Sequence, residues 1–595
     1  MAEDRHWTNA FRIKGRKSIY FYSLVIGVVS GLGALGFYYG LHYAELFTHG
    51  LASLTPDYLL YGHGAGGPSP NPWILFFLPA AGGLIVGILV HLFSPHSGGA
   101  GTETLIDSFH QREGRIDAEV PLAKSAGTIF TLSSGGSAGH EGPTALIGAG
   151  FGSILAGLVQ AGARARRTLM LAGTAGGLGA IFCAPFGGAM TAVEVIYKED
   201  IESDSLVPCV ISSVTAYLVF TGITGKGSIF TIPSLEFTSS WELIFYFILG
   251  LLCYPAGYLF TRTQHFARGF FGRLKVHPIL KPVLGGLAIG VFALIFPQVI
   301  GNGHDFLQHV MMGRSPLPGS TGPALAGFFL LVAVLKGIST AFTVGSGGSG
   351  GVFGPSLFIG GMLGGSVGTL AGHLFPGLHV SISAFVLVGM AAFFAGIART
   401  PIASMIMVSD MIGSYKLLPA LMIVSIVAFI LHHRWSIYKG QVRNRFQSPA
   451  HYWDMNLDIL EKMTIAADFP RYRAKAIVKK SLLLSQLEEK ALDIQASDFV
   501  VVGEAGEYHG MISLRQVRLT RDLDLIRGLV TVEDADRDIA AVTPGTSLGQ
   551  ALRLILENEV DKIAIAESEA GDAKLLGYIR YTDILRLYHA KVRRA

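Results

Sequence analysis

The sequence predicts a polytopic α-helical membrane protein that ends in a soluble α/β region. Of its 595 residues, 50% are hydrophobic and only 15% are charged, whereas soluble domains carry about 25% charged residues. Long segments hold no Asp, Glu, Lys or Arg, and the composition turns charged after about residue 434. The uncharged segments are 18–44, 72–101, 168–193, 206–225, 243–261, 282–304 and 337–398.

Basic residues precede the first uncharged segment, and no small-residue cleavage site follows them, so this end is not a signal peptide. They are Arg5, Arg12, Lys14, Arg16 and Lys17. The positive-inside rule predicts that the tail 1–17 is cytoplasmic in a multi-pass protein of the cell membrane. With an even number of spans, the soluble C-terminal region lies on the same face of the lipid bilayer.

The uncharged segments have the length that spanning helices need, about 20 residues. The chain has 76 glycines, and Gly and Pro inside the segments predict closely packed helices, some broken or re-entrant. The cysteines, at 183, 209 and 253, all lie in apolar segments, which predicts neither a disulfide nor a metal site. No nucleophile–base pair stands out, so we expect no enzyme.

An internal repeat divides the membrane region. "SGGSAGHEGPTALIGAGFGS" (134–153) matches "SGGSGGVFGPSLFIGGMLGG" (346–365), with an offset of 346 − 134 = 212. "AIFCAPFGGAMTAVEV" (180–195) matches "GIARTPIASMIMVSDM" (396–411), with an offset of 396 − 180 = 216 and Glu194 opposite Asp410. The halves are about 18–225 and 240–433. Repeats are common in transporters, and the sequence leaves open whether these are parallel or inverted.

Both Gly-rich segments of the repeat read as loops that lead into helices. Pro suits the first turn of a helix, so Gly142-Pro143 and Gly354-Pro355 predict helix starts with uncovered backbone N–H groups. Such ends attract anions, and two of them inside a membrane would bind an anion weakly enough to release it. Neither loop holds the Lys of a nucleotide-binding P-loop.

Glu141 is the one charged residue between Lys124 and Arg164. An acid at membrane depth indicates function. Because it stands at the predicted helix start, its carboxylate could occupy the anion site when deprotonated and leave it when protonated. The sequence therefore predicts a proton-sensitive gate, and a structural capping role is the alternative.

"GHEGP" (139–143) and "GGVFGP" (350–355) resemble two signature motifs of the CLC family of chloride channels and proton-coupled chloride exchangers. "GGAGTE" (98–103) is similar to a weakened third motif. The resemblance covers 18–445 and implies an inverted-repeat homodimer with one chloride pathway per subunit, gated by Glu141. It implies that the backbone of the two motifs is formed by Gly139, His140, Gly142, Pro143, Gly351, Gly354 and Pro355. It also implies that the anion is contacted by Ala100, Gly101, Val352, Phe353 and Tyr438.

The sequence departs from the family pattern in the first loop and beside the gate. Ala100 replaces a serine that donates a hydroxyl to the anion in many members, and Glu103 replaces a proline. Fluoride or nitrate transport is therefore a remote alternative to chloride. His140 could tune Glu141 with pH or be an ordinary polar residue at the mouth. Tyr438 could instead be an interfacial tyrosine.

A further departure bears on proton coupling. Exchangers of the family often carry an inner proton-transferring glutamate, and the resemblance puts that position at Val195, with Glu194 beside it as a structural acid. Valine there favours a channel. A proton-coupled exchanger is the alternative, because water or the nearby acids could carry protons. These acids are Glu199, Asp200 and Glu202.

The C-terminal region resembles a pair of CBS domains (named for cystathionine β-synthase). "SDFVVVGEAGEYHGMISLRQV" (497–517) matches "DKIAIAESEAGDAKLLGYIRYTDIL" (561–585). We expect a linker and first unit over 446–530 and a second unit over 531–595. Such pairs often bind adenine nucleotides, and each unit keeps half of that signature, at Ser513 and Asp583. The alternatives are a regulatory nucleotide or a purely structural pair. We expect no other cofactor and no nucleic acid.

Overall fold

A computed structural model describes residues 16–62, 70–93, 98–232, 241–317, 319–378, 380–451, 457–469, 473–494, 496, 498–513, 530–536, 539–558, 560–568 and 573–594. The chain forms two compact units, Met1–His451 and Tyr452–Ala595. The first unit thus extends past the predicted end of the membrane domain at residue 445. Each unit is described below by itself.

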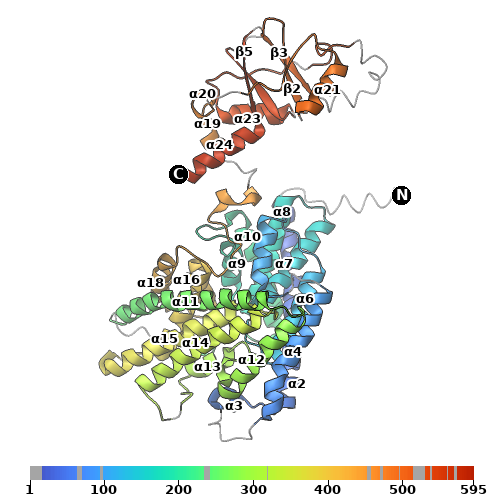
Figure 1. The fold of residues 1–595 in the computed structure, drawn as a ribbon. Helices are drawn as coiled ribbons and strands as arrows, with labels where there is room; N and C mark the ends of the chain where they lie inside the picture. The colour runs from blue at the N-terminus through green and yellow to red at the C-terminus, as the bar shows by residue number, and fades with distance from the viewer. Residues whose placement is uncertain are drawn as a thin grey trace. The chain divides into compact units, whose positions relative to one another are not determined.

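The first unit is helical, as the sequence predicts (Figure 1). Its first half contains α2 (Arg16–Ala52), α3 (Pro56–Tyr61), α4 (Pro72–Leu92), α5 (Gly101–His110), α6 (Glu119–Ser133), α7 (Glu141–Leu158), α8 (Ala163–Ile181), α9 (Pro185–Glu194) and α10 (Leu206–Thr224). Its second half contains α11 (Glu242–Arg273), α12 (Leu280–Ile295), α13 (His304–Met311), α14 (Pro323–Gly345), α15 (Phe353–Leu374), α16 (Ile382–Ala398), α17 (Pro401–Ile412) and α18 (Leu418–Leu431).

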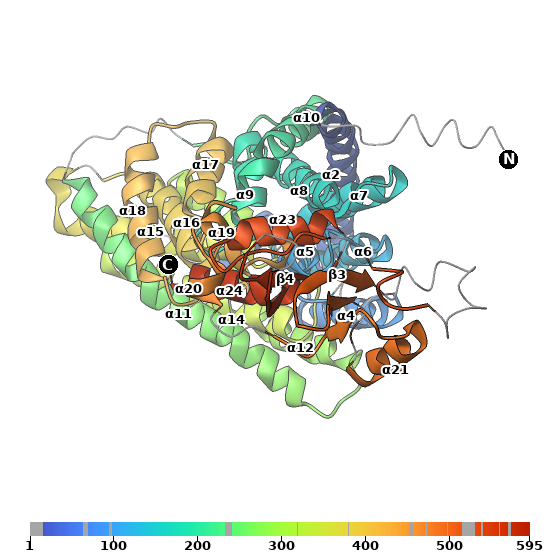
Figure 2. The ribbon, with the colours of Figure 1, turned by 90° about the horizontal axis from the view of Figure 1, so that it is seen from above.

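Among the described residues, 6 helices are long and apolar enough to cross a membrane. They include α4, α14 and α15, and further apolar helices such as α16 and α18 are shorter. Seen from above, α7, α8 and α10 lie on one side, and α15, α16 and α18 of the second half lie on the other (Figure 2). The short helices agree with the predicted broken segments.

The two halves are inverted relative to each other, which the sequence left open. Helix α4 packs against α12, and a Cβ at Gly83 would collide with the carbonyl oxygen of Pro282, while a Cβ at Gly286 would collide with that of Pro79. Residue numbers rise along one helix as they fall along the other, so these corresponding helices run antiparallel. Glycine at both contacts lets the backbones approach closely.

The predicted pair Glu194 and Asp410 holds the halves together. The Glu194 carboxylate accepts hydrogen bonds from the backbone N–H groups of Ile402 (3.2 Å) and Ala403 (2.6 Å) at the start of α17. The Asp410 carboxylate accepts from Phe186 and Gly187, both at 3.0 Å, at the start of α9. Each acid caps the helix that corresponds to its own, so Glu194 has a structural role.

The second unit contains two small sheets, each flanked by helices. Its elements are α19 (Leu457–Glu461), α20 (Ile465–Asp468), β1 (Ile477–Lys479), α21 (Leu484–Ile494), β2 (Asp498–Val502), β3 (Tyr508–Ser513), α23 (Leu548–Glu557), β4 (Lys562–Ala566), β5 (Leu575–Arg580) and α24 (Tyr581–Arg594). Strand β2 pairs parallel with β1 and antiparallel with β3, and β4 pairs antiparallel with β5. The β2–β3 and β4–β5 hairpins coincide with the two matched segments of the sequence.

Candidate anion site and its gate

Three Gly-rich loops meet in the core of the first unit. The N–H of Gly99 donates to the carbonyl of Gly348 (3.1 Å), and the N–H of Gly350 donates back to that of Gly99 (3.3 Å). Gly139 and Gly351 exchange two N–H···O bonds, both of 2.7 Å. These bonds bring the starts of α5, α7 and α15 together, although their sequences are far apart.

The three helix starts have no side-chain cap from the residue that precedes them, which agrees with the donors that the Gly-rich motifs predict. Ala100 precedes α5, His140 precedes α7 and Val352 precedes α15, and none of the three makes a side-chain cap. All three are buried. Helix α7 begins at Glu141 and α15 at Phe353, so Pro143 and Pro355 each lie in the first turn. Free N–H groups and helix dipoles here favour an anion.

The Glu141 carboxylate occupies this place. Its side chain is fully buried (0% exposed), and its Oε2 accepts a hydrogen bond of 3.1 Å from the N–H of Gly354 in the first turn of α15. A Cβ on Gly139 or on Gly354 would collide with the carboxylate. The glycines of both motifs therefore make room for Glu141, whose oxygens stand where an anion would lie.

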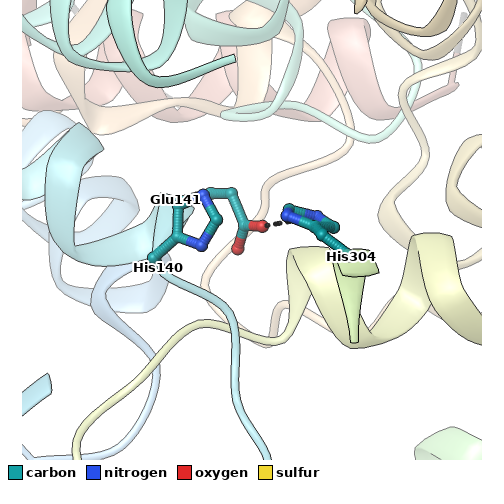
Figure 3. A group of neighbouring side chains, drawn as sticks. All are labelled: His140, Glu141 and His304. Atoms are coloured by element: carbon teal, nitrogen blue, oxygen red, sulfur yellow. Dashed lines mark ion pairs between the residues drawn. The ribbon is translucent and has the colours of Figure 1, made fainter. Parts of the chain in front are cut away.

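His304 faces the gate from the start of α13 (Figure 3). Its Nε2 lies 3.7 Å from Oε1 of Glu141, and neither atom has a hydrogen-bond partner among the described residues. The His140 ring lies 5.1 Å from the His304 ring, and its Nδ1 lies 3.4 Å from Nδ2 of Asn302. His304 carries no signal in the sequence, because nothing in "GNGHD" (301–305) marks it.

The surroundings of this cluster favour an anion over a metal ion. Ligand atoms of His140, Glu141 and His304 lie within 4.8 Å of one another, and they are of types that zinc accepts. The Nζ of buried Lys336, however, donates to the carbonyl of Gly301 at 2.7 Å and interacts electrostatically with Glu141. A lysine and helix N-termini repel a cation and attract a carboxylate or chloride.

Tyr438 reaches the start of α5. The residue is 1% exposed, its hydroxyl interacts with the Thr102 side chain, and its N–H donates to Oγ of Ser436 (3.2 Å). Ala100, the residue before α5, is buried and offers no hydroxyl. Tyr438 therefore lies with the helix starts in the core, and not among the exposed tyrosines of the surface.

Val195 and Glu103 occupy defined positions at the sites where the sequence departs from the family pattern. Val195 is buried, and its carbonyl accepts a hydrogen bond of 2.7 Å from Nε2 of Gln441. Glu103 forms an ion pair of 2.8 Å with Arg268. The charge of Glu103 is therefore balanced by Arg268, and Val195 contributes a backbone carbonyl but no titratable side chain.

The predicted nucleotide residues lie in the second unit. Both oxygens of Asp583 accept hydrogen bonds of 2.8 Å from Arg473, and Arg580 lies 3.3 Å away. Ser513 ends β3 opposite Asp498, and the residues that follow it, 514–529, lie outside the described residues. Asp583 is thus engaged by two arginines of its own unit.

Two inverted helical halves, with helix starts that converge on the buried Glu141 carboxylate, are the arrangement expected of an anion-transport protein of the membrane. The family model described as voltage gated chloride channel matches residues 82–433, and the CBS domain model matches 526–590. The chain belongs to the voltage gated chloride channel family, also called the CLC family, and carries a CBS region. The resemblance drawn from its motifs is confirmed.

Related proteins carry the names of both functional types. A putative chloride channel protein, ClcB-like, from Ralstonia nicotianae is 31% identical over 381 residues, which cover 63% of this chain and 86% of the relative. An H(+)/Cl(-) exchange transporter, ClcA, from Vibrio cholerae is 29% identical over 428 residues, which cover 69% and 86%. The fold matches a slow cyanobacterial Cl-/H+ antiporter with a TM-score of 0.62 at 22% identity, over 71% of this chain and 96% of the other.

Proposed function

We propose that this protein exchanges chloride for protons across the membrane, with Glu141 as the group that couples the two. The observation that carries the proposal is the Glu141 carboxylate at the N–H of Gly354, in the anion position itself. The channel interpretation, which rested on Val195, has less support, since relatives named H(+)/Cl(-) exchange transporters match over 69% of the chain. The proposed function is transport and not an enzymatic reaction.

Glu141 couples chloride to protons because its carboxylate and chloride compete for the same position. A deprotonated Glu141 fills the anion position and blocks chloride. Protonation removes the charge that holds the carboxylate against the start of α15, so chloride can take its place while the proton moves with the side chain. Because Glu141 is fully buried, each exchange of carboxylate for chloride moves a proton with it.

Chloride is the anion that this site suits best. The donors are backbone N–H groups at Gly101, Val352 and Phe353, with the Tyr438 hydroxyl. These neutral donors bind a halide weakly and reversibly. Ala100 removes one hydroxyl donor, so fluoride and nitrate belong in the same assay.

We further propose that the face holding the start of α8 is cytoplasmic. This helix begins with Arg164, Arg166 and Arg167, and Arg443 and Arg445 stand near the end of the same unit. Basic residues concentrate on the cytoplasmic side of membrane proteins. The chain leaves the first unit at His451, next to these arginines, and Ile19 and Tyr22 near the start of α2 pack in one cluster with Ala165 of α8. We therefore propose that the N-terminus and the CBS region are both cytoplasmic.

Two assembly properties complete the proposal. The resemblance supports a homodimer with one pathway in each subunit, which the mass of the purified protein in detergent tests. A regulatory adenine nucleotide is proposed between Ser513 and Asp583. Since Arg473 already pairs with Asp583, nucleotide must displace an ion pair, and we expect weak binding that Asp583→Asn weakens further.

The decisive experiment uses purified protein in chloride-loaded vesicles. Valinomycin triggers chloride efflux, and a pH electrode follows external protons at the same time. We expect proton uptake linked to chloride efflux that reverses with the imposed gradient. Glu141→Gln keeps the shape of the gate but removes its titration, so proton movement stops while chloride still moves.

The result separates the competing functions. Fast chloride efflux without proton movement in the wild-type protein would make it a channel and refute exchange. Absence of chloride movement, with fluoride or nitrate efflux in its place, would redirect the assignment to those anions. In that case Ala100→Ser is the matched variant that restores the missing hydroxyl.

A further inference from the structure

Another buried carboxylate, that of Glu202, lies at the face proposed to be cytoplasmic. Glu202 precedes α10, and the residue is 3% exposed. Its Oε2 accepts a hydrogen bond of 2.8 Å from the Tyr197 hydroxyl and lies 2.8 Å from Nε2 of His451. Its Oε1 lies 3.8 Å from Arg445. A carboxylate buried among titratable partners at such a place is a candidate for function.

The other acids of this segment are engaged differently. The Glu199 side chain is 35% exposed and pairs with Arg443 at 2.7 Å. The Asp200 carboxylate accepts hydrogen bonds from the backbone N–H groups of Ile201 (2.8 Å) and Arg445 (2.9 Å). Of these three acids, Glu202 alone is buried and in contact with an imidazole.

A series of hydrogen bonds connects the segment that contains Glu202 to the anion site. The N–H of Glu202 donates to the carbonyl of Val193 (2.9 Å), two residues before Val195. The carbonyl of Val195 accepts from Gln441. Gln441 in turn bonds Ser436, which accepts from the N–H of Tyr438. Glu202 therefore lies at the outer end of the segment whose inner end reaches Tyr438.

His451 is oriented to exchange a proton with Glu202. Nε of Arg445, a donor, lies 3.4 Å from Nδ1 of His451, so Nδ1 accepts and Nε2–H faces the carboxylate. If the Arg445 N–H moves away from Nδ1 and a hydronium ion protonates that atom, Nε2 gives its own proton to Oε2, so the imidazole ends neutral, water is left behind and Glu202 becomes a carboxylic acid. The titratable and charged groups around Glu202 are His110, Tyr197, Asp204, Cys209, Arg445 and His451.

We propose that Glu202, together with His451, forms the proton-entry site through which protons pass from the cytoplasmic side on their way to Glu141. The proposal rests on the proposed proton exchange. It accounts for the valine at position 195, because Glu202, a few residues along the chain, takes up the proton in its place. Water carries the proton along the stretch that Val195 lines.

The test measures protons per chloride in vesicles for the wild-type protein and three variants. In Glu202→Gln we expect chloride still to move while proton flux per chloride falls about a hundredfold, the size of a typical general acid–base contribution. The matched control Glu199→Gln removes an exposed acid from the same segment and should leave the ratio unchanged. Adding Val195→Glu to Glu202→Gln should restore proton flux.

Each outcome bears on one proposal or the other. An uncoupled wild-type protein overturns both. A coupled wild-type protein whose Glu202→Gln variant keeps its full ratio overturns the role of Glu202 and leaves exchange intact. If Glu202→Gln fails to fold, His451→Gln takes its place, and an unchanged ratio of protons to chloride in that variant equally refutes the proton-entry site. A merely structural Glu202 would lower both fluxes together.

Discussion

The two halves of the membrane unit share one framework of contacts but differ in chemistry at their helix starts. Gly139 bonds to Gly351, its counterpart in the repeat, and Glu194 and Asp410 cap each other's helices. Where the first half has Glu141, however, the second half has Phe353. The symmetric contacts hold the helix starts in place, and the asymmetric pair puts a carboxylate, the proposed gate, at one of them. Scaffold and function can therefore be tested separately.

The largest effect on chloride transport is expected beside the asymmetric pair, in Gly354→Ala. The three atoms nearest to a Cβ at this position all belong to the Glu141 carboxylate, so the methyl group should expel the gate without touching the backbone. Losing a hydrogen bond to a charged group costs about 1.5 kcal/mol, or about tenfold in occupancy. We expect chloride flux to rise and proton coupling to fall by about that factor in the vesicle assay.

The same substitution in a Glu141→Ala background provides the control. Without a carboxylate there is nothing to collide with, so the added methyl group should have no further effect on either flux. An equal effect in both backgrounds would mean that Gly354 matters for backbone packing and not for the gate.

Substitutions in the symmetric framework should lower the stability of the folded protein, and by different amounts in the two halves. Glu194 is 5% exposed, whereas Asp410 is only partly buried and also accepts from the Tyr415 hydroxyl. Glu194→Ala leaves unpaired the N–H groups of Ile402 and of buried Ala403, which we expect to cost about 3 kcal/mol. Asp410→Ala should cost about 1 kcal/mol, because water can replace the cap.

Thermal unfolding in detergent, followed by the loss of the monodisperse species, measures both variants against the exposed-acid control Glu199→Ala. Equal losses for Glu194→Ala and Asp410→Ala would show that the two caps are equivalent and that burial does not set their cost.

The smallest effect is expected in the second unit, where Asp561 precedes β4. Burial, together with a hydrogen bond to Asp498, raises the pKa of Asp561 to about 6, although Lys562 opposes the shift. The folded state therefore holds more protons than the unfolded state between about pH 4 and 6, and stability falls as pH rises through that window. Because the side chain is 46% exposed, we expect a loss of about 1 kcal/mol or less after solvent screening.

Asp561→Asn should remove this decline, so the variant gains stability relative to the wild-type protein above pH 6 and not below pH 4. Urea unfolding of the second unit in the full-length protein, read by pulse proteolysis at several pH values, measures it. A gain that is the same at every pH would assign the effect to the amide and not to titration.

The sequence predicts the framework well because its signals are local. Uncharged segments give the helices, and Gly-Pro pairs give the helix starts that carry Val352 and Glu141. The direction of the repeat could not be predicted, because small residues allow close packing in either direction. His304 was missed because its role depends on a contact with Glu141 from a distant part of the chain. For Glu202, the sequence offered three neighbouring acids, and burial distinguished one of them.

The self-pairing of Gly139 with Gly351 bears on the ancestry of the chain. A contact between a residue and its own counterpart closes equally well between two separate copies of one half, as do the reciprocal caps. The Gly139–Gly351 pair and the two caps therefore do not require a covalent link between the halves. Two copies of a single ancestral half would supply both partners of each of these contacts, and Glu141, opposite Phe353, marks one way in which the two halves diverged.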